Sequence, residues 1–484
     1  MPGNDSPVPQ VCMGFILRHP LRIDPPPDQG EFGIKRRSPV FPRERDEERI
    51  RRLSESSYTP TTQILLQMMD EEFRCSFLLS GVFIEHLEGA DPDLYELLSQ
   101  ATAHRNAEVL SESYYNTAMG AIPDSDEFRI QVEMHRLLMT EFSGRKPSIL
   151  VAPCRIFNRN IVRAALDEGF SAIYTDVFDT YHSAYDQFSG YTLDGIPFLI
   201  RHCKLSDDIA IRYGDVDWEY HPLTARTYAG WIRGMGKCTV HILVDMEVFG
   251  GRYSRDTGIL DFLQALPGAY ADAGIHPVLP SEEVKMITAA DMFSDEQMEE
   301  VFGRWPQNMM QCTALDALRT AGRWVPDRTA WRRFQAMPLF QAMATTEGSC
   351  GMVKTQRSQA EAYLEFSRYM AALSRFEEEQ SQMVRAGSAA RFLRCIPPER
   401  AFHFCTPYHR EGFSAHSLEE FVKLLDVASD DCIKHHGERS DIATWIREVI
   451  GDTTLAGRMQ TLRGRNEIAE AVEKRIHELW KRLK

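Results

Sequence analysis

The feature that most constrains the fold is a repeated alternation between short apolar segments and helical segments in the first part of the chain. Strands separated by helices predict a parallel sheet covered by helices, and both a closed barrel and an open doubly wound sheet fit that pattern. Neither G-x-G-x-x-G nor G-x-x-x-x-G-K-[ST] occurs, which removes the usual nucleotide-binding versions. The predicted strands are 11–17, 73–79, 107–110, 148–153, 171–175, 197–203 and 239–245, and the predicted helices are 91–104, 126–142, 158–168, 224–235 and 257–265.

A change of pattern after Ala289, where the strands stop, indicates a helical second part. A last helix at 466–483 carries an apolar stripe that fits a core or a dimer interface. The other predicted helices of this part are 294–303, 309–321, 328–344 and 357–385. The sequence therefore predicts three domains: 11–289 (α/β), 290–386 (a helical bundle) and 397–484 (a small α+β accessory domain).

The composition limits the partners and the compartment. The 484 residues carry a net charge of −15, and an acidic surface argues against nucleic acid as the main partner. The 10 cysteines occur without a C-x-x-C pair, so they predict reduced thiols and no disulfide framework. The N-terminal segment lacks a basic start and an apolar run, and no apolar stretch is long enough to span a membrane. We therefore expect a soluble, cytoplasmic protein.

The residues at the carboxyl ends of the predicted strands are the first candidates for a functional site, because chemistry collects there in parallel α/β folds. Asp245 and Glu247 close the strongest strand, and residues two apart on a strand point to the same side. Two crowded carboxylates raise each other's pKa, which suits a general acid; a helix cap plus a solvated glutamate is the alternative. The other strand-end candidates are Arg18, His19, Glu108, Glu112 and Cys154.

Several segments resemble glycoside hydrolase family 57, the α-amylase group. VDMEVFGG (244–251) resembles a motif of the type MDYETFGEH, and AEVLSESYYNTA (107–118) resembles a V-E-x-L-x-E-T-Y-Y-H-S-L segment. The resemblance covers Val11 to Glu379. Further matching stretches, in the same order, are FRCSFLLSGVFIEHLE (73–88), KLSDDIAIRY (204–213), HPLTARTYAGWI (221–232), TGILDFLQALP (257–267) and WPQNMMQCTALDAL (305–318).

The resemblance implies a distorted (β/α)7 barrel followed by a helical bundle, and a retaining mechanism on α-1,4-glucans without a cofactor. In that mechanism a glutamate attacks the sugar and an aspartate acts as acid and base. Carried over, Asp245 takes the acid/base position. The family's nucleophile segment aligns with LVAPCRIF (150–157), so Cys154 takes the nucleophile position. The substrate-binding positions implied are Arg18, His19, Glu108, Glu247 and Trp305.

The departures from the family concentrate in the expected cleft. Arg18 stands for a histidine, Asn116 for another histidine, and Gly251-Arg252 for a Glu-His pair. A thiolate nucleophile is disfavoured, because neighbouring carboxylates raise a thiol pKa. A relocated carboxylate is a second option, with Asp176, Asp179, Asp207 and Asp208 as candidates. The leading interpretation is that Cys154 is a small residue that fills space in a site that no longer hydrolyses glucan.

A metal site is not expected from the sequence. His19, His202 and His241 are isolated along the chain, and His435-His436 point in different directions if they lie on a helix.

Three functional hypotheses follow. The first is a family 57-like protein that binds α-glucan or maltooligosaccharide and has lost hydrolysis, or nearly so. The second is an active α-glucan hydrolase or transferase with a relocated nucleophile. The third is a scaffold or regulatory partner of a glycogen-metabolising enzyme, with the C-terminal domain as its protein-binding module.

Overall fold

The computed structural model describes residues 8–19, 21–23, 40–122, 126–153, 157–176, 191–287, 291–292, 305–345 and 358–483. The chain divides into two compact units. The first comprises Met1–Leu21, Arg43–Trp305 and Thr346–Gln356, and the second comprises Arg22–Pro42, Pro306–Thr345 and Arg357–Lys484.

The first unit is built on two sheets. In one, β1 (Gln10–Leu17), β2 (Cys75–Leu79), β3 (Ala107–Val109) and β8 (Thr239–Asp245) run parallel in the order β3-β2-β1-β8, and β9 (His276–Pro277) pairs with the start of β1. The other has the order β10-β6-β7-β5-β4. Its strands are β4 (Ile149–Val151), β5 (Ala172–Thr175), β6 (Tyr191–Leu193), β7 (Ile196–Ile200) and β10 (Asp291–Met292).

One parallel bridge joins the two sheets at each of their shared edges. Ser111 pairs with Leu150 beyond the end of β3, and Arg201 pairs with His241 beyond the end of β7. The strands therefore follow one another in a ring, β1-β2-β3-β4-β5-β7-β8, in which two of the junctions are single bridges. This arrangement agrees with the predicted fold class, a distorted barrel of seven strands.

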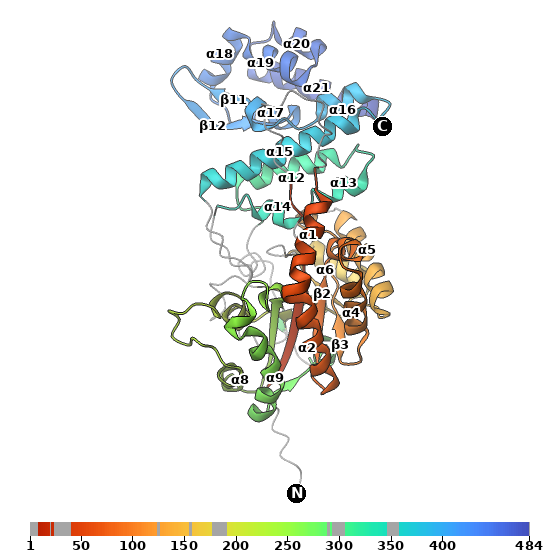
Figure 1. Cartoon of the computed structure of the whole chain (residues 1–484). Helices are drawn as coiled ribbons and strands as arrows, with labels where there is room; N and C mark the ends of the chain where they lie inside the picture. Colours follow the sequence, from red (N-terminus) through yellow and green to blue (C-terminus); the bar gives the residue numbers. More distant parts are fainter. Residues whose placement is uncertain are drawn as a thin grey trace. The chain divides into compact units, whose positions relative to one another are not determined.

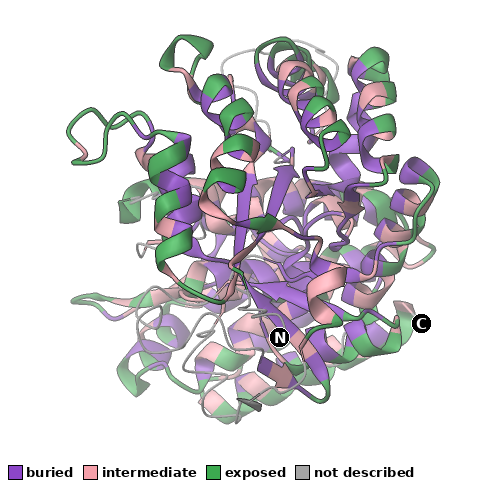
Figure 2. Cartoon of the chain, turned by 90° about the horizontal axis from the view of Figure 1, so that it is seen from below, coloured by how far each residue is buried: buried purple, intermediate pink, exposed green. Residues whose placement is uncertain are grey.

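Helices cover the outside of this ring (Figure 1). Local signals set their starts: Asp91 accepts a hydrogen bond from Leu94 N at 3.0 Å, and Pro92 is the first helical residue of α4. Figure 2 shows buried strands surrounded by helices that are buried on one side and exposed on the other. The covering helices include α2 (Thr59–Asp70), α3 (Gly81–Ala90), α4 (Pro92–Ala103), α5 (Asp126–Ser143), α6 (Arg159–Asp167), α8 (Ala225–Gly234) and α9 (Ile259–Ala273).

Helix α1 (Arg43–Leu53) is an element that the sequence pattern missed. The segment 24–46 is predicted to be a surface loop; its residues 24–39 lie outside the described part, and the helix begins at Arg43. Its sequence, RERDEERIRRL, has only Ile50 and Leu53 as apolar residues, so it shows no apolar periodicity. Acidic residues in its first turn and basic residues in its last turn favour the helix through its dipole.

The second unit is mostly helical, as predicted. The predicted helix 309–321 is α12 (Met309–Ala321), and 357–385 contains α15 (Gln359–Ser381). The predicted helix 328–344 is divided into α13 (Arg328–Arg333) and α14 (Met337–Gln341), with Pro338 in the first turn of α14. The predicted helix 294–303 lies outside the described residues. The expectation that strands stop after Ala289 is wrong for the short β10.

The C-terminal part of this unit combines a hairpin with further helices. Ile468, Val472 and Leu479 are buried in α21, where it packs against α16, α17 and α20. The stripe on the last helix is therefore core in this chain. The elements are α16 (Gly387–Leu393), β11 (Phe402–Cys405), β12 (Arg410–Ala415), α17 (Leu418–Leu425), α18 (Asp430–Arg439), α19 (Asp441–Trp445), α20 (Thr453–Met459) and α21 (Arg465–Leu483).

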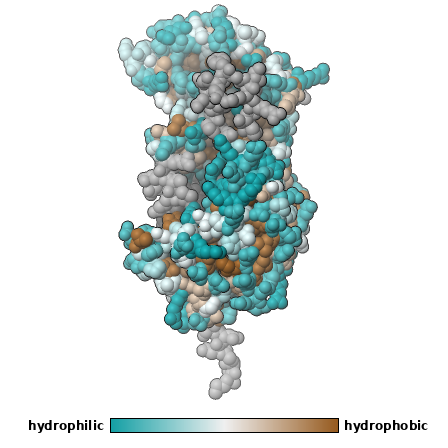
Figure 3. Space-filling view, viewed as in Figure 1, coloured by the Kyte–Doolittle hydropathy of each residue, from teal (hydrophilic) through white to brown (hydrophobic). Residues whose placement is uncertain are grey.

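The surface in Figure 3 is mainly hydrophilic, with smaller hydrophobic areas between the polar residues. Among the described helices, none has both the length and the apolar character needed to cross a membrane.

Candidate active site at the carboxyl end of the barrel

Strand alternation decides which side chains point into the barrel. On β8, Val240, Ile242 and Val244 belong to the core between sheet and helices, whereas Leu243 belongs to the core inside the ring. Successive side chains of a strand point to opposite faces, so Asp245 continues the inward series after Leu243. In the parallel pairing of β1 with β8, Asp245 is the partner of Ile16, so Asp245 lies beside the point where β1 ends.

The Asp245 carboxyl has a raised pKa, in the range that suits a general acid. Its pKa is raised to about 6, mainly because burial disfavours the charged form. Arg18, Arg252 and Arg201 oppose this rise, and Glu247 adds to it. A carboxyl group with a pKa near 6 can donate a proton at slightly acidic to neutral pH. The predicted effect of Glu247 is present, but it is smaller than the effect of burial.

We expect Asp245→Asn to stabilise the fold in a pH-dependent way. Because the folded-state pKa is raised, the wild type loses stability as pH rises from about 4 to about 6, while the amide does not ionise. The gain in unfolding free energy should be small at pH 4 and reach at most about 3 kcal/mol at pH 7. Urea denaturation at both pH values measures it. The exposed Asp194→Asn is the matched control, and an equal gain at both pH values would contradict the prediction.

Arg18 and Glu112 form an ion pair beside Asp245. Arg18 follows β1, and its Nε donates to Glu112 Oε2 at 2.8 Å. Glu112 is almost fully buried, after β3. Arg18 thus neutralises a buried carboxylate and at the same time opposes the rise in the pKa of Asp245.

Glu247 and His19 are each held by α1. Arg49 binds both carboxylate oxygens of Glu247, at 3.0 and 2.8 Å. His19 Nε2 lies 2.9 Å from Asp46 Oδ1, and the ring of His86 on α3 is 5.9 Å from the ring of His19. His19, Asp46 and His86 are buried and close enough to share a metal ion. The unpredicted helix α1 therefore contributes to the site.

A second network of charged side chains, centred on Arg201, was not predicted from the sequence as a group. Arg201, after β7, is buried; its Nη2 donates to Asp207 at 2.9 Å and its Nε donates to Leu243 O at 3.1 Å. Asp176, after β5, lies 3.8 Å from it. Burial raises the pKa of Asp207, and Arg201 opposes the rise. A charged residue at the end of an apolar strand, as in PFLIRHC, is the sequence signal that points to Arg201.

One predicted residue, Glu108, is placed away from this group. Glu108 lies within β3, and its carboxylate accepts hydrogen bonds from Ser281 N at 2.9 Å and from the Ser148 hydroxyl at 3.4 Å. Burial raises its pKa. These contacts anchor the short helix α10 (Pro280–Val284) to the barrel. Trp305 is partly buried.

The predicted nucleophile position, Cys154, lies outside the described residues, which stop at Pro153 and resume at Phe157. The preceding strand β4 ends at Val151, at the same end of the barrel as Asp245. Phe249, four residues after the end of β8, is a core residue, fully buried and 5.8 Å from the Phe15 ring.

Comparison with known proteins agrees with these observations. The model of the family "Glycosyl hydrolase family 57" matches residues 32–301. A protein of Methanocaldococcus jannaschii described as "Putative alpha-amylase" is 27% identical over 295 residues, which are 59% of this chain and 63% of that protein. The chain thus spans less than two thirds of the length of this relative.

Solved structures show the same fold. The 4-alpha-glucanotransferase of Thermococcus litoralis superposes with a TM-score of 0.53 at 16% identity, over 76% of this chain and 60% of that one. The GH57-type branching enzyme of Pyrococcus horikoshii also gives 0.53, at 11% identity, over 78% of this chain and 92% of that one. The resemblance seen in the sequence is confirmed: the chain belongs to glycosyl hydrolase family 57.

Proposed function

We propose that this chain binds α-glucans at the carboxyl end of its barrel and hydrolyses them very slowly or not at all. The proposal rests on two features: Asp245 stands at the acid/base position with a pKa near 6, and Cys154 stands at the nucleophile position. Without a nucleophile an enzyme loses orders of magnitude of rate while its binding groups persist. The α-glucan class is taken from the names of the similar enzymes.

The observation that most favours a loss of hydrolysis is that the neighbouring carboxylates form ion pairs with arginines. Each carboxylate that follows β3, β7 or β8 near Asp245 is bound to an arginine: Glu112 to Arg18, Asp207 to Arg201 and Glu247 to Arg49. An attacking carboxylate has to face the anomeric carbon at a defined position, about 5–5.5 Å from the acid/base. Carboxylates oriented toward arginines are poorly placed to replace the missing glutamate.

Incubation of the full chain with maltooligosaccharides and glycogen, followed by calorimetric titration of the same oligosaccharides, tests the proposal. We expect measurable binding and no release of reducing ends above the no-protein rate. Turnover that disappears in Asp245→Asn would overturn the loss of hydrolysis, and absent binding would overturn the glucan site.

Trp305 offers a test of the binding position. Removing an aromatic ring that stacks on a sugar costs about 1 kcal/mol, so Trp305→Ala should weaken oligosaccharide binding about fivefold or more. Trp218, which packs with Tyr220 and Trp231, is the matched control, and Trp218→Ala should leave affinity unchanged. Equal losses in both variants would contradict the assignment of Trp305.

An active enzyme that uses Glu112 is the second candidate. Glu112 Oε1 is buried and accepts no hydrogen bond from the described residues, and Arg18 acts on both Glu112 and Asp245. Glu112 is the carboxylate that would act as the nucleophile in this alternative. Slow wild-type turnover that Glu112→Gln abolishes would favour this candidate over lost hydrolysis.

The scaffold hypothesis concerns the C-terminal segment 397–484. Tyr408, between β11 and β12, is 93% exposed and is available for contact with a protein partner. This role stays a prediction.

A further inference from the structure

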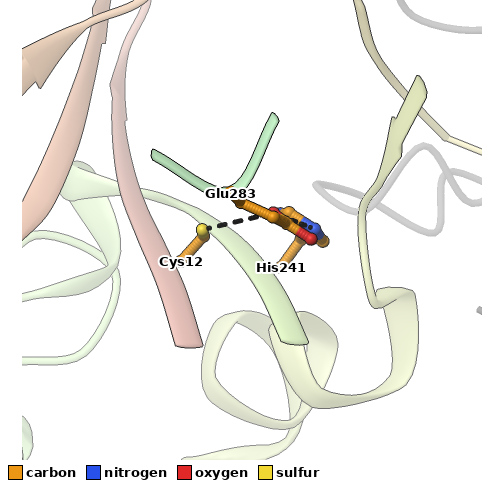
Figure 4. A group of neighbouring side chains, drawn as sticks. All are labelled: Cys12, His241 and Glu283. Atoms are coloured by element: carbon orange, nitrogen blue, oxygen red, sulfur yellow. Dashed lines mark hydrogen bonds and ion pairs between the residues drawn. The ribbon is translucent and has the colours of Figure 1, made fainter. Parts of the chain in front are cut away.

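Three side chains with metal-binding atoms lie close together inside the barrel. They lie near the start of β8, whereas Asp245 lies at its end. Cys12 comes from β1, His241 from β8 and Glu283 from α10 (Figure 4). Cys12 Sγ lies 3.7 Å from Glu283 Oε2, and His241 Nε2 lies 2.9 Å from the same oxygen. All three donor atoms lie within 4.8 Å of one another.

Regular structure holds these groups in place. Cys12 and His241 are register partners in the parallel pair β1–β8, and both face the barrel interior. Glu283 is presented by α10, whose first turn is fixed by the bond from Ser281 N to Glu108. Side chains on paired strands and a capped helix have little freedom, which is the condition for a preorganised ion site.

A second layer orients the imidazole. The buried Tyr174 hydroxyl lies 2.7 Å from His241 Nδ1, so Nε2 is turned toward Cys12 and Glu283. Protein histidines that bind metals usually have their other nitrogen held by such a hydrogen bond, which sets the tautomer.

The charges of this cluster also suit a cation. Cys12 is fully buried, and the Glu283 side chain is 14% exposed. A divalent ion would be neutralised by one thiolate and one carboxylate, whereas two anionic groups without a counter-ion are costly to bury.

We propose that Cys12, His241 and Glu283 form a binding site for a Zn²⁺ ion. In a tetrahedral zinc site with metal–sulfur and metal–nitrogen distances of about 2.3 and 2.0 Å, neighbouring donor atoms lie about 3.3–3.6 Å apart. The separations of 2.9 and 3.7 Å bracket this range, and the third, between Cys12 Sγ and His241 Nε2, is within 4.8 Å, so small side-chain shifts would admit the ion. Three protein ligands leave the fourth position for a small ligand such as water.

Binding has a defined proton balance. The Cys12 thiol releases its proton to solvent, and His241 coordinates through Nε2 while Nδ1–H donates to the Tyr174 oxygen. The ion would connect β1, β8 and α10 at the end of the barrel opposite the glucan site. The site is therefore independent of the proposed function.

Titration of the chelator-treated full chain with Co²⁺ tests the proposal, because a cobalt–thiolate bond gives a charge-transfer band in the near ultraviolet. We expect saturation at one ion per chain and displacement of the band by Zn²⁺. Absence of the band would overturn the proposal.

Matched cysteine variants identify the ligand. Cys75 is also fully buried and lies on the adjacent strand β2, but it faces the helices. Cys12→Ala should abolish the band and Cys75→Ala should retain it; a band that survives Cys12→Ala overturns the site.

If Cys12→Ala fails to fold, Glu283→Gln decides, because it should weaken zinc binding at least tenfold. Tyr174→Phe, which removes only the outer hydrogen bond, should weaken zinc binding about 10–100-fold.

Discussion

Replacing Cys154 with glutamate is expected to raise the rate of maltooligosaccharide hydrolysis by about 10³-fold or more, from a baseline near zero. The substitution restores a carboxylate at the position that aligns with the family's nucleophile, while Asp245 is already present with a pKa raised to about 6. An acid/base with that pKa is protonated below pH 6, so the restored activity should fall as pH rises above about 6.

Reducing-sugar release over a pH series measures this gain. Cys154→Gln is the matched control, because it has the size of glutamate without the nucleophilic carboxylate. The double variant Cys154→Glu/Asp245→Asn should lose the gain, which ties the activity to the pair. A Cys154→Glu protein that binds oligosaccharides but stays inactive would show that other departures, such as Arg18, have also disabled the site.

Arg201→Met is expected to destabilise the fold by about 3–5 kcal/mol at neutral pH. Arg201 pairs with the mostly buried Asp207, lies near Asp176, and donates to Leu243 O where β7 meets β8. Removing the guanidinium leaves the mostly buried Asp207 carboxylate without the arginine that neutralises it, at a junction made of a single bridge. The loss should shrink in acid, because Asp207, whose pKa burial already raises, becomes neutral once protonated.

Chemical denaturation at pH 7 and pH 4 checks both parts of this prediction. Arg105→Met is the control, since the Arg105–Glu72 pair is mostly exposed, and it should change stability by less than about 1 kcal/mol. A loss for Arg201→Met no larger than that of the control would mean that Arg201 does not stabilise the junction.

Much of the framework could be predicted because its signals are local. Strand β8 and helix α12 have the predicted bounds, and Asp91 and Pro92 begin a helix as their capping chemistry requires. Helix α1 could not be found in this way, because its stability comes from contacts with α3 and from charge, and its few apolar residues give no periodicity.

The sequence by itself determined the family, the alternation of strands and helices, the position of Asp245 at a strand end and the cysteine at 154. Only the tertiary structure decided which groups are neighbours. Arg18 meets Glu112, Arg201 meets Asp207, and Cys12 meets His241 and Glu283, over separations of up to 271 residues. Parallel strands bring together residues of equal height from distant segments, so isolation along a sequence does not imply isolation inside a barrel.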